Sequence, residues 1–157
     1  MKCALVTGGS RGIGSAICQK LAEDSNYHIL INYQSNKAAA EETLALVKDK
    51  GATGEIIQFN VANFEEVQAT LSKWQDDNPD AIVEVIVNNA GITKDGLFMW
   101  MSHEDWNNVI NTSLNGFYNV TNFFIQKLLR NKYGRIVNMV SVSGVKGTAG
   151  QTNYSAA

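Results

Sequence analysis

The sequence predicts an α/β domain in which a parallel β-sheet is covered by helices on both faces. Strand-like apolar segments alternate with amphipathic helical segments along the chain, and several of the strand-like segments are apolar over most of their length. A glycine-rich turn joins the first strand to the first helix. The 157 residues, 45% hydrophobic and 18% charged, fit one domain over residues 1–157.

The first half of the chain begins with a short apolar run, residues 3–8, that ends in glycines and predicts a buried strand. Residues 11–24 predict a helix because apolar side chains recur at a spacing of four. These side chains are Ile13, Ile17 and Leu21. A second strand is expected at residues 28–32. A second helix, rich in Ala, Glu and Leu, is expected at residues 36–51 with Gly51 at its C-terminal end.

The second half continues the alternation, with strands expected at residues 55–61, 81–91 and 134–141. Asn63 and Glu66 have the spacing of a helix start, and Val67, Leu71 and Trp74 then form an apolar stripe. Ser102 is expected to cap a long helix. Its apolar side chains are Trp106, Val109, Ile110, Phe117, Val120, Phe124 and Leu128.

Composition argues against several classes of function. The net charge of −2 gives no basic excess for nucleic acid, and no apolar run approaches the roughly 20 residues that cross a bilayer. No signal peptide is recognised. Cys3 and Cys18 lack metal-ligand spacing, so we expect reduced, buried thiols in a cytoplasmic protein and no metal site. His28 and His103 are isolated in polar turns and are not expected to act as ligands.

The glycine-rich turn, Thr7–Gly14, is the first candidate site. Glycines there allow a tight turn and a close approach of backbone N–H groups to a ligand, and the following helix start adds positive partial charge. A pyrophosphate is the expected ligand, although the same pattern also occurs in a plain strand-to-helix turn. The candidate cofactor-binding residues of the turn are Gly8, Gly9, Ser10, Arg11, Gly12, Ile13 and Gly14.

The spacing T-G-x-x-x-G-I-G resembles the short-chain dehydrogenase/reductase family, and three further segments agree with it in order. These are N-N-A-G after the fourth strand, Ser141 at the end of the fifth, and Tyr154 in a Y-S-A-A sequence. The resemblance implies a Rossmann-like, doubly wound sheet with strand order 3-2-1-4-5. It also assigns further cofactor-binding residues, namely Asn60 and Val61 beside the adenine, and Asn88, Asn89, Ala90 and Gly91.

The end of the second strand favours NADPH over NADH. Family members that use NADH carry an acidic residue there, which binds the ribose hydroxyls and repels a 2′-phosphate. This sequence has Tyr33, Gln34 and Ser35 instead, with Gln34 and Ser35 as candidate contacts. Arg11 can supply a positive charge to the phosphate, although it could also be a solvated loop residue.

The resemblance implies that Tyr154 is the general acid of a carbonyl reduction and also touches the cofactor, while Ser141 hydrogen-bonds the substrate carbonyl. The family places a lysine four residues after the tyrosine, at what would be residue 158. We therefore expect this chain to be the N-terminal part of a longer enzyme, incomplete at its C-terminus and inactive alone. Ser113 stands where the family usually has an asparagine of a proton relay, and Asn115 falls on the opposite helix face.

Residues 88–110 look most like the 3-oxoacyl-[acyl-carrier-protein] reductases of fatty-acid biosynthesis. This predicts an NADPH-dependent reduction of a 3-oxoacyl thioester. Acetoacetyl-CoA reductases, another short-chain alcohol dehydrogenase, and a non-catalytic nucleotide-binding module remain alternatives. Met99, Trp100 and Met101 could line an acyl entrance or an interface.

A carrier protein is acidic, so the partner prediction needs a basic surface. Lys127, Arg130, Lys132 and Arg135 cluster at the end of the long helix and could dock a carrier, or simply complement the helix dipole. Family membership also implies a homotetramer for the full-length protein.

Overall fold

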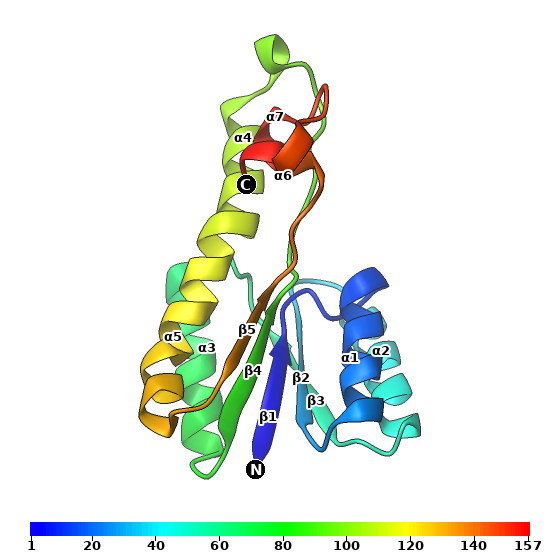
Figure 1. Ribbon diagram of the computed structural model, residues 1–157, viewed down its shortest axis with the longest axis vertical. Coiled ribbons are helices and arrows are strands. Elements are labelled where there is room, and N and C mark those ends of the chain that lie inside the picture. The colour runs from blue at the N-terminus through cyan, green and yellow to red at the C-terminus, as the bar shows by residue number, and fades with distance from the viewer.

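The computed structural model describes residues 1–157 and contains one five-stranded parallel sheet with the order β3-β2-β1-β4-β5 (Figure 1). The predicted fold class and strand order are confirmed. The strands are β1 (Lys2–Val6), β2 (His28–Tyr33), β3 (Gly54–Gln58), β4 (Ile82–Asn88) and β5 (Arg135–Asn138). Because all five run the same way, their carboxyl ends meet at one edge of the sheet, where ligands of such folds bind.

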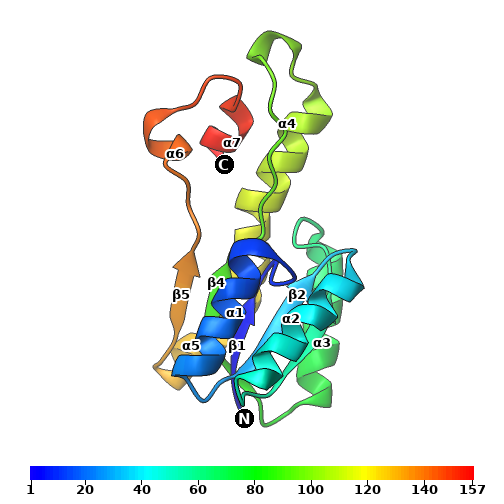
Figure 2. The same cartoon turned by 90° about the vertical axis from the view of Figure 1, so that its right-hand side faces the viewer.

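Helices cover both faces of the sheet, as Figures 1 and 2 show. One face carries α1 and α2, and the other carries α3 and α5. The long helices are α1 (Gly12–Asp24), α2 (Lys37–Asp49), α3 (Phe64–Asp77), α4 (His103–Ile110) and α5 (Gly116–Asn131). Buried side chains form two apolar layers, 15 residues on the α3–α5 side and nine on the α1–α2 side. The sheet is therefore a rigid platform between two cores.

Three helices begin where the sequence places a polar cap. Asn36, Asn63 and Ser102 each accept a hydrogen bond from the backbone N–H three residues later. The Glu66 side chain reaches back to the Asn60 N–H at 3.0 Å, which fixes the backbone that follows β3. Since β3 ends at Gln58 and not at residue 61, this bond acts on the loop where cofactor contacts were expected.

The long helix after Ser102 is interrupted by one wide turn. Residues Asn111–Asn115 (η2) form a π-helical turn between α4 and α5, where a continuous α-helix was expected. Such turns add a residue to the helix and occur often at functional sites. The turn joins α4, which lies beyond the carboxyl edge of the sheet, to α5, which packs on the sheet (Figure 1).

Two local expectations are wrong. Ile13 is 63% exposed at the start of α1, whereas Ile17 and Leu21 pack, partly buried, against the core beside buried Cys18 and Ala22. The fifth strand stops at Asn138, so Ser141 lies three residues beyond it in a turn. All four residues of β5 are exposed, as its position at the sheet edge implies.

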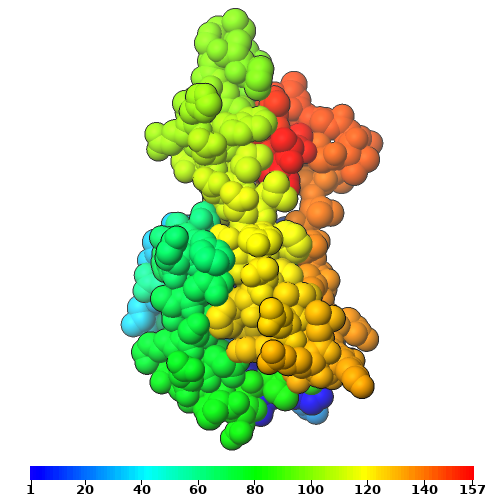
Figure 3. Space-filling view, turned by 90° about the vertical axis from the view of Figure 1, so that its left-hand side faces the viewer, coloured from blue at the N-terminus to red at the C-terminus, as the bar shows by residue number.

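The C-terminal segment contains α6 (Ser143–Lys146) and α7 (Thr152–Ala156), which lie beyond the carboxyl edge of the sheet. It packs beside α4 rather than on the sheet, as the red and lime atoms in Figure 3 show. The loop before α4 contains a short 3₁₀ turn, Phe98–Trp100 (η1), whose three side chains are exposed. None of the helices is both long enough and apolar enough to span a bilayer.

Candidate active site

The glycine-rich turn lies at the carboxyl end of β1 and leads directly into α1. No side chain caps the start of α1 at Arg11, and its first turn holds no acidic residue. The first backbone N–H groups of the 13-residue helix therefore have no side-chain partner within the chain.

Close backbone packing makes Gly14 the most constrained residue of the turn. A Cβ on Gly14 would overlap the carbonyl of Gly8 and lie 2.6 Å from Nδ2 of Asn89. Gly8 itself has φ +61°, which favours glycine. The turn therefore folds tightly against the loop after β4 and leaves its outer face free for a ligand.

Thr7 fixes that neighbouring loop. Its side-chain oxygen accepts hydrogen bonds from the N–H groups of Asn89 and Ala90, each at 3.0 Å, and it lies 3.3 Å from the Val87 carbonyl. Asn89 in turn donates to the carbonyls of Thr7, at 2.9 Å, and Gly8, at 3.1 Å. The N-N-A-G segment is thus bound to the end of β1 by both side chains and backbone.

Asn32, in β2, holds the turn from the other side and was not predicted as a site residue. Its Oδ1 accepts the Gly8 N–H at 3.1 Å, and its Nδ2 donates to the Phe59 carbonyl at 3.0 Å. The residue is 2% exposed. A lone amide inside the apolar run H-I-L-I-N was the sequence signal, because a buried amide needs specific partners.

These segments enclose a cleft of about 470 Å³, a volume typical of small-molecule sites. Most of the predicted cofactor residues line it. They are Gly8, Ser10, Arg11, Gly12, Ile13, Gly14, Gln34, Ser35, Asn60, Val61, Asn89, Ala90 and Gly91. Tyr33, noted at the end of the second strand but not predicted as a contact, also lines it. The sequence did not single out the other lining residues, which are Asn32, Asn36, Phe59, Ile92 and Thr112.

Two of the predicted cofactor residues are placed behind the cleft. Gly9 is buried, and a Cβ there would lie 3.0 to 3.1 Å from Ile31, Cys18 and Val6. Asn88 donates to the side chains of Thr121 and Asn138, each at 3.0 Å. Both residues support the walls of the cleft in this structure and do not line it.

Arg11 is the one charged residue of the cleft lining, and no carboxylate lines it. Its guanidinium forms no ion pair or side-chain hydrogen bond within the chain. A free guanidinium in a site without acidic groups favours a ligand that carries phosphate.

The loop after β3 is held by α5. A Cβ on Gly116 would lie 2.7 Å from the Val61 side chain, and Asn119 Nδ2 donates to the Val61 carbonyl at 2.9 Å. Close packing against a helical glycine thus places Asn60 and Val61 at the wall where adenine contacts were expected.

Ser141 and Tyr154 belong to one small folded unit beyond the sheet. The Ser141 hydroxyl oxygen accepts the Ser143 N–H at 3.1 Å, which leaves its own proton free to donate. Gly144 lies against the Ser155 carbonyl, next to Tyr154. No hydrogen bond joins the two hydroxyls, and neither residue lines the 470 Å³ cleft.

Ser113 lies in the π turn. Its buried Oγ has no hydrogen-bond partner in the chain, and it lies 3.5 Å from the Cβ position of Gly91 at the cleft wall. Asn115 is exposed and donates to the Asn111 side chain at 2.7 Å. The structure thus places Ser113, and not Asn115, beside the N-N-A-G loop.

The predicted basic patch is smaller than expected. Lys127 donates to Gln75 at 2.9 Å and lies over the Phe123 ring, and burial lowers the pKa of its ammonium group. Arg130, Lys132 and Arg135 are exposed at the end of α5 and the start of β5. They therefore lie at the edge of the sheet opposite the cleft.

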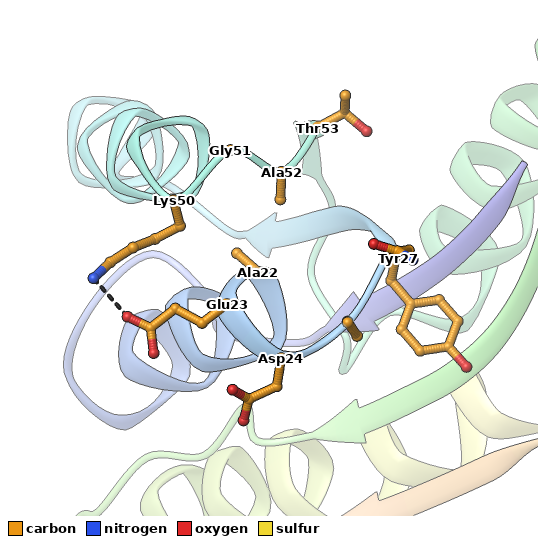
Figure 4. Close-up of a pocket in the computed structure, with 10 residues that line it drawn as sticks. Ala22, Glu23, Asp24, Tyr27, Lys50, Gly51, Ala52 and Thr53 are labelled. Atoms are coloured by element: carbon orange, nitrogen blue, oxygen red, sulfur yellow. Dashed lines mark ion pairs between the residues drawn. The ribbon is translucent and has the colours of Figure 1, made fainter.

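A second hollow, of about 460 Å³, lies between the C-terminal ends of α1 and α2 (Figure 4). Lys50 pairs with Glu23 there at 2.6 Å, and this contact lowers the pKa of the Glu23 carboxyl. The lysine already offsets the negative partial charge at the C-terminal ends of the two helices. The hollow also lies far from the glycine turn. It carries none of the predicted site residues.

Both cysteines are free and buried, and burial raises the pKa of Cys3 to about 11 and that of Cys18 to about 12. Cys18 packs behind Gly9, with its Sγ 4.0 Å from the Gly9 carbonyl. A neutral thiol in this position packs as a small apolar group.

This sheet, the glycine turn and the N-N-A-G loop define a Rossmann-like fold. The family model for short chain dehydrogenases matches residues 2–157, and the chain belongs to this family.

Curated relatives narrow the resemblance within the family. The chain is 42% identical over 155 residues to a 3-oxoacyl-[acyl-carrier-protein] reductase FabG of Staphylococcus epidermidis, which covers 99% of this chain and 62% of the relative. It is 41% identical over 158 residues to a 3-oxoacyl-[acyl-carrier-protein] reductase of Synechocystis, covering 98% of this chain and 61% of the relative. The chain is 40% identical over 157 residues to a FabG of Vibrio harveyi, and the alignment covers 99% of this chain and 61% of the relative. The chain thus spans about three fifths of the length of these relatives.

Proposed function

We propose that this protein reduces a 3-oxoacyl thioester to the 3-hydroxyacyl thioester with NADPH, as a 3-oxoacyl-[acyl-carrier-protein] reductase of fatty-acid biosynthesis. The single observation that carries the proposal is the cleft between the uncapped N-terminus of α1 and the N-N-A-G loop. The chain that forms this cleft belongs to the short chain dehydrogenase family and is similar to such reductases. Free, buried cysteines support a cytoplasmic location.

The cleft is proposed to hold the dinucleotide. The N–H groups at the start of α1 would hold the diphosphate, because no side chain of the protein caps them. Asn60 and Val61 would border the adenine. The bound cofactor would supply a hydride to the substrate carbonyl.

NADPH is favoured because Arg11 is unpaired and no carboxylate lines the cleft. Gln34 and Ser35, which follow β2 and line the same cleft as Arg11, would complete the contacts to a 2′-phosphate. An acidic residue at this position would instead repel a phosphate dianion.

Tyr154 and Ser141 would complete the reduction. Ser141 is proposed to donate its free proton to the carbonyl oxygen in a hydrogen bond, and Tyr154 to protonate that oxygen as it gains charge. Both groups come from the segment that packs beside α4, so closure of this segment over the bound cofactor is part of the proposal.

The test uses the protein expressed from its complete reading frame and follows NADPH consumption at 340 nm with acetoacetyl-CoA. Wild-type protein should turn over, and Tyr154→Phe should lose about 10²- to 10⁴-fold in kcat while NADPH still binds. An unchanged kcat in Tyr154→Phe, or no thioester reduction by the wild type, would overturn the proposal.

The cofactor choice is tested with Arg11→Ala. Losing a charge-assisted contact to the 2′-phosphate, about 1.5–3 kcal/mol, should raise the KM for NADPH by about 10- to 100-fold. The KM for NADH should change by less than threefold, because NADH has no 2′-phosphate. Equal changes in the KM values for NADPH and NADH would show that Arg11 does not contact the 2′-phosphate.

Carrier docking is tested at the exposed cations. Lys132→Glu should raise the KM for an acyl-carrier substrate and leave the KM for acetoacetyl-CoA unchanged, because only the carrier is large and acidic enough to reach the patch. A homotetramer is proposed for the complete protein, and sedimentation at several concentrations measures it.

A further inference from the structure

Asn153 has the most completely buried polar side chain in the chain, with 0% exposure. Its Nδ2 lies 3.0 Å from the Lys94 carbonyl and 3.3 Å from the Asp105 carbonyl, and its Oδ1 accepts the Tyr154 N–H at 2.8 Å. Both amide protons and the amide oxygen are therefore used. A buried amide with every partner in place fixes local geometry strongly.

The three partners of Asn153 belong to three separate segments. Lys94 lies in the loop that follows the N-N-A-G segment, Asp105 lies in the first turn of α4, and Tyr154 lies in α7. Asn153 thus joins the tyrosine to the loop that borders the cofactor cleft and to the helix beside it.

The segment has other contacts, but none is made by a fully buried side chain. The Gly96 N–H donates to the Gly150 carbonyl at 2.8 Å, Gln151 donates to Asp95 at 2.9 Å at the exposed surface, and the Ser143 hydroxyl donates to Gln151 at 3.2 Å. No side chain caps α7, and the Tyr154 hydroxyl makes no hydrogen bond within the chain. The place of the phenol is therefore set by its backbone, and Asn153 is the buried group that holds that backbone.

We propose that Asn153 is the positioning residue of Tyr154: its amide sets where the phenol stands for proton transfer. This inference rests on the proposed function. A displacement of about 1 Å in a reacting group can cost about 10²-fold in rate, so the effect should fall on kcat. Cofactor binding should be spared, because Asn153 does not line the cleft.

The first test compares Asn153→Ala with Gln151→Ala. The control removes a neighbouring, less buried amide that donates to Asp95 and accepts from the Ser143 hydroxyl. In the protein from the complete reading frame, Asn153→Ala should lower kcat about 10- to 100-fold and change the NADPH dissociation constant by less than twofold. Gln151→Ala should keep kcat within threefold. A kcat within twofold of wild type in Asn153→Ala would overturn the proposal.

A double-mutant comparison separates positioning from general destabilisation. If Asn153 acts through the phenol, Asn153→Ala should cause no further loss of rate in the Tyr154→Phe background. An equal loss in both backgrounds would overturn the proposal. If the alanine variant does not fold, Asn153→Ser, which keeps a small polar group, is measured with the same two expected outcomes.

A last readout does not need turnover. Nitration of Tyr154 by tetranitromethane, followed by peptide mass spectrometry, should become several-fold faster in Asn153→Ala and remain unchanged in Gln151→Ala. An unchanged nitration rate would overturn the positioning role even in an active enzyme. Absence of thioester reduction by the wild type, with faster nitration in the variant, would overturn the proposed function alone.

Discussion

The Thr7 hydroxyl provides the sharpest test of how the candidate site is built. Thr7 is 2% exposed, and its oxygen is the acceptor for two N–H groups, those of Asn89 and Ala90. Thr7→Val keeps the shape of the side chain but leaves both donors without a partner. Each buried, unpaired donor costs about 1–3 kcal/mol, and these two are partly buried, so we expect a loss of about 2–4 kcal/mol in the free energy of unfolding.

The same substitution should weaken cofactor binding, because Asn89 and Ala90 line the cleft. If the substitution also weakens the free energy of NADPH binding by about 1 kcal/mol, the NADPH dissociation constant rises about fivefold. Urea unfolding followed by circular dichroism, at one protein concentration, and a fluorescence titration with NADPH measure the two effects. Thr7→Ser keeps the acceptor and serves as the matched control, with an expected loss of about 1 kcal/mol for the missing methyl group.

The reasoning would be refuted if Thr7→Val and Thr7→Ser unfolded within about 0.5 kcal/mol of each other, a difference too small for two orphaned donors. It would also be refuted if the valine variant bound NADPH as tightly as the serine variant.

Two further predictions concern the glycine turn and the two buried thiols. Gly14→Ala should lose about 1–3 kcal/mol of stability and most NADPH binding, because its Cβ meets backbone and the Asn89 amide, and neither can withdraw. Gly51→Ala, at φ +83° in open space, should lose about 1 kcal/mol without any change in binding, so similar NADPH affinities in both variants would contradict the overlap. Cys18 should resist alkylation at pH 8, because with its pKa raised to about 12 only about one molecule in ten thousand is a thiolate. Cys3, with a pKa of about 11, should react faster than Cys18 but far more slowly than either thiol in urea, and rapid modification of the folded protein would contradict the burial.

The sheet could be predicted because it depends on long, repeated signals. Apolar strands bounded by turns, and caps such as Asn63 and Ser102, fix the order and the starts of the elements independently of tertiary contacts. The glycine turn could also be predicted, because backbone sterics determine the spacing of its glycines.

The remaining features depend on contacts between distant segments. Ile13 belongs to the apolar pattern of α1, but the helix starts at the cleft edge and leaves it exposed. Nothing local distinguishes Asn153, inside the polar run Q-T-N-Y, from a surface amide until Lys94 and Asp105 are brought beside it. The π turn around Ser113 likewise arises between α4, which lies beyond the sheet, and α5, which packs on it, and carries no clear signal in the sequence.

A crystal structure of the complete protein with NADPH would test the central claim most directly. We expect the diphosphate within about 3 Å of the N–H groups at the start of α1, the 2′-phosphate beside Arg11, and the nicotinamide ring directed toward Tyr154. A cofactor bound in the hollow between the C-terminal ends of α1 and α2, or one whose nicotinamide points away from Tyr154, would contradict the account.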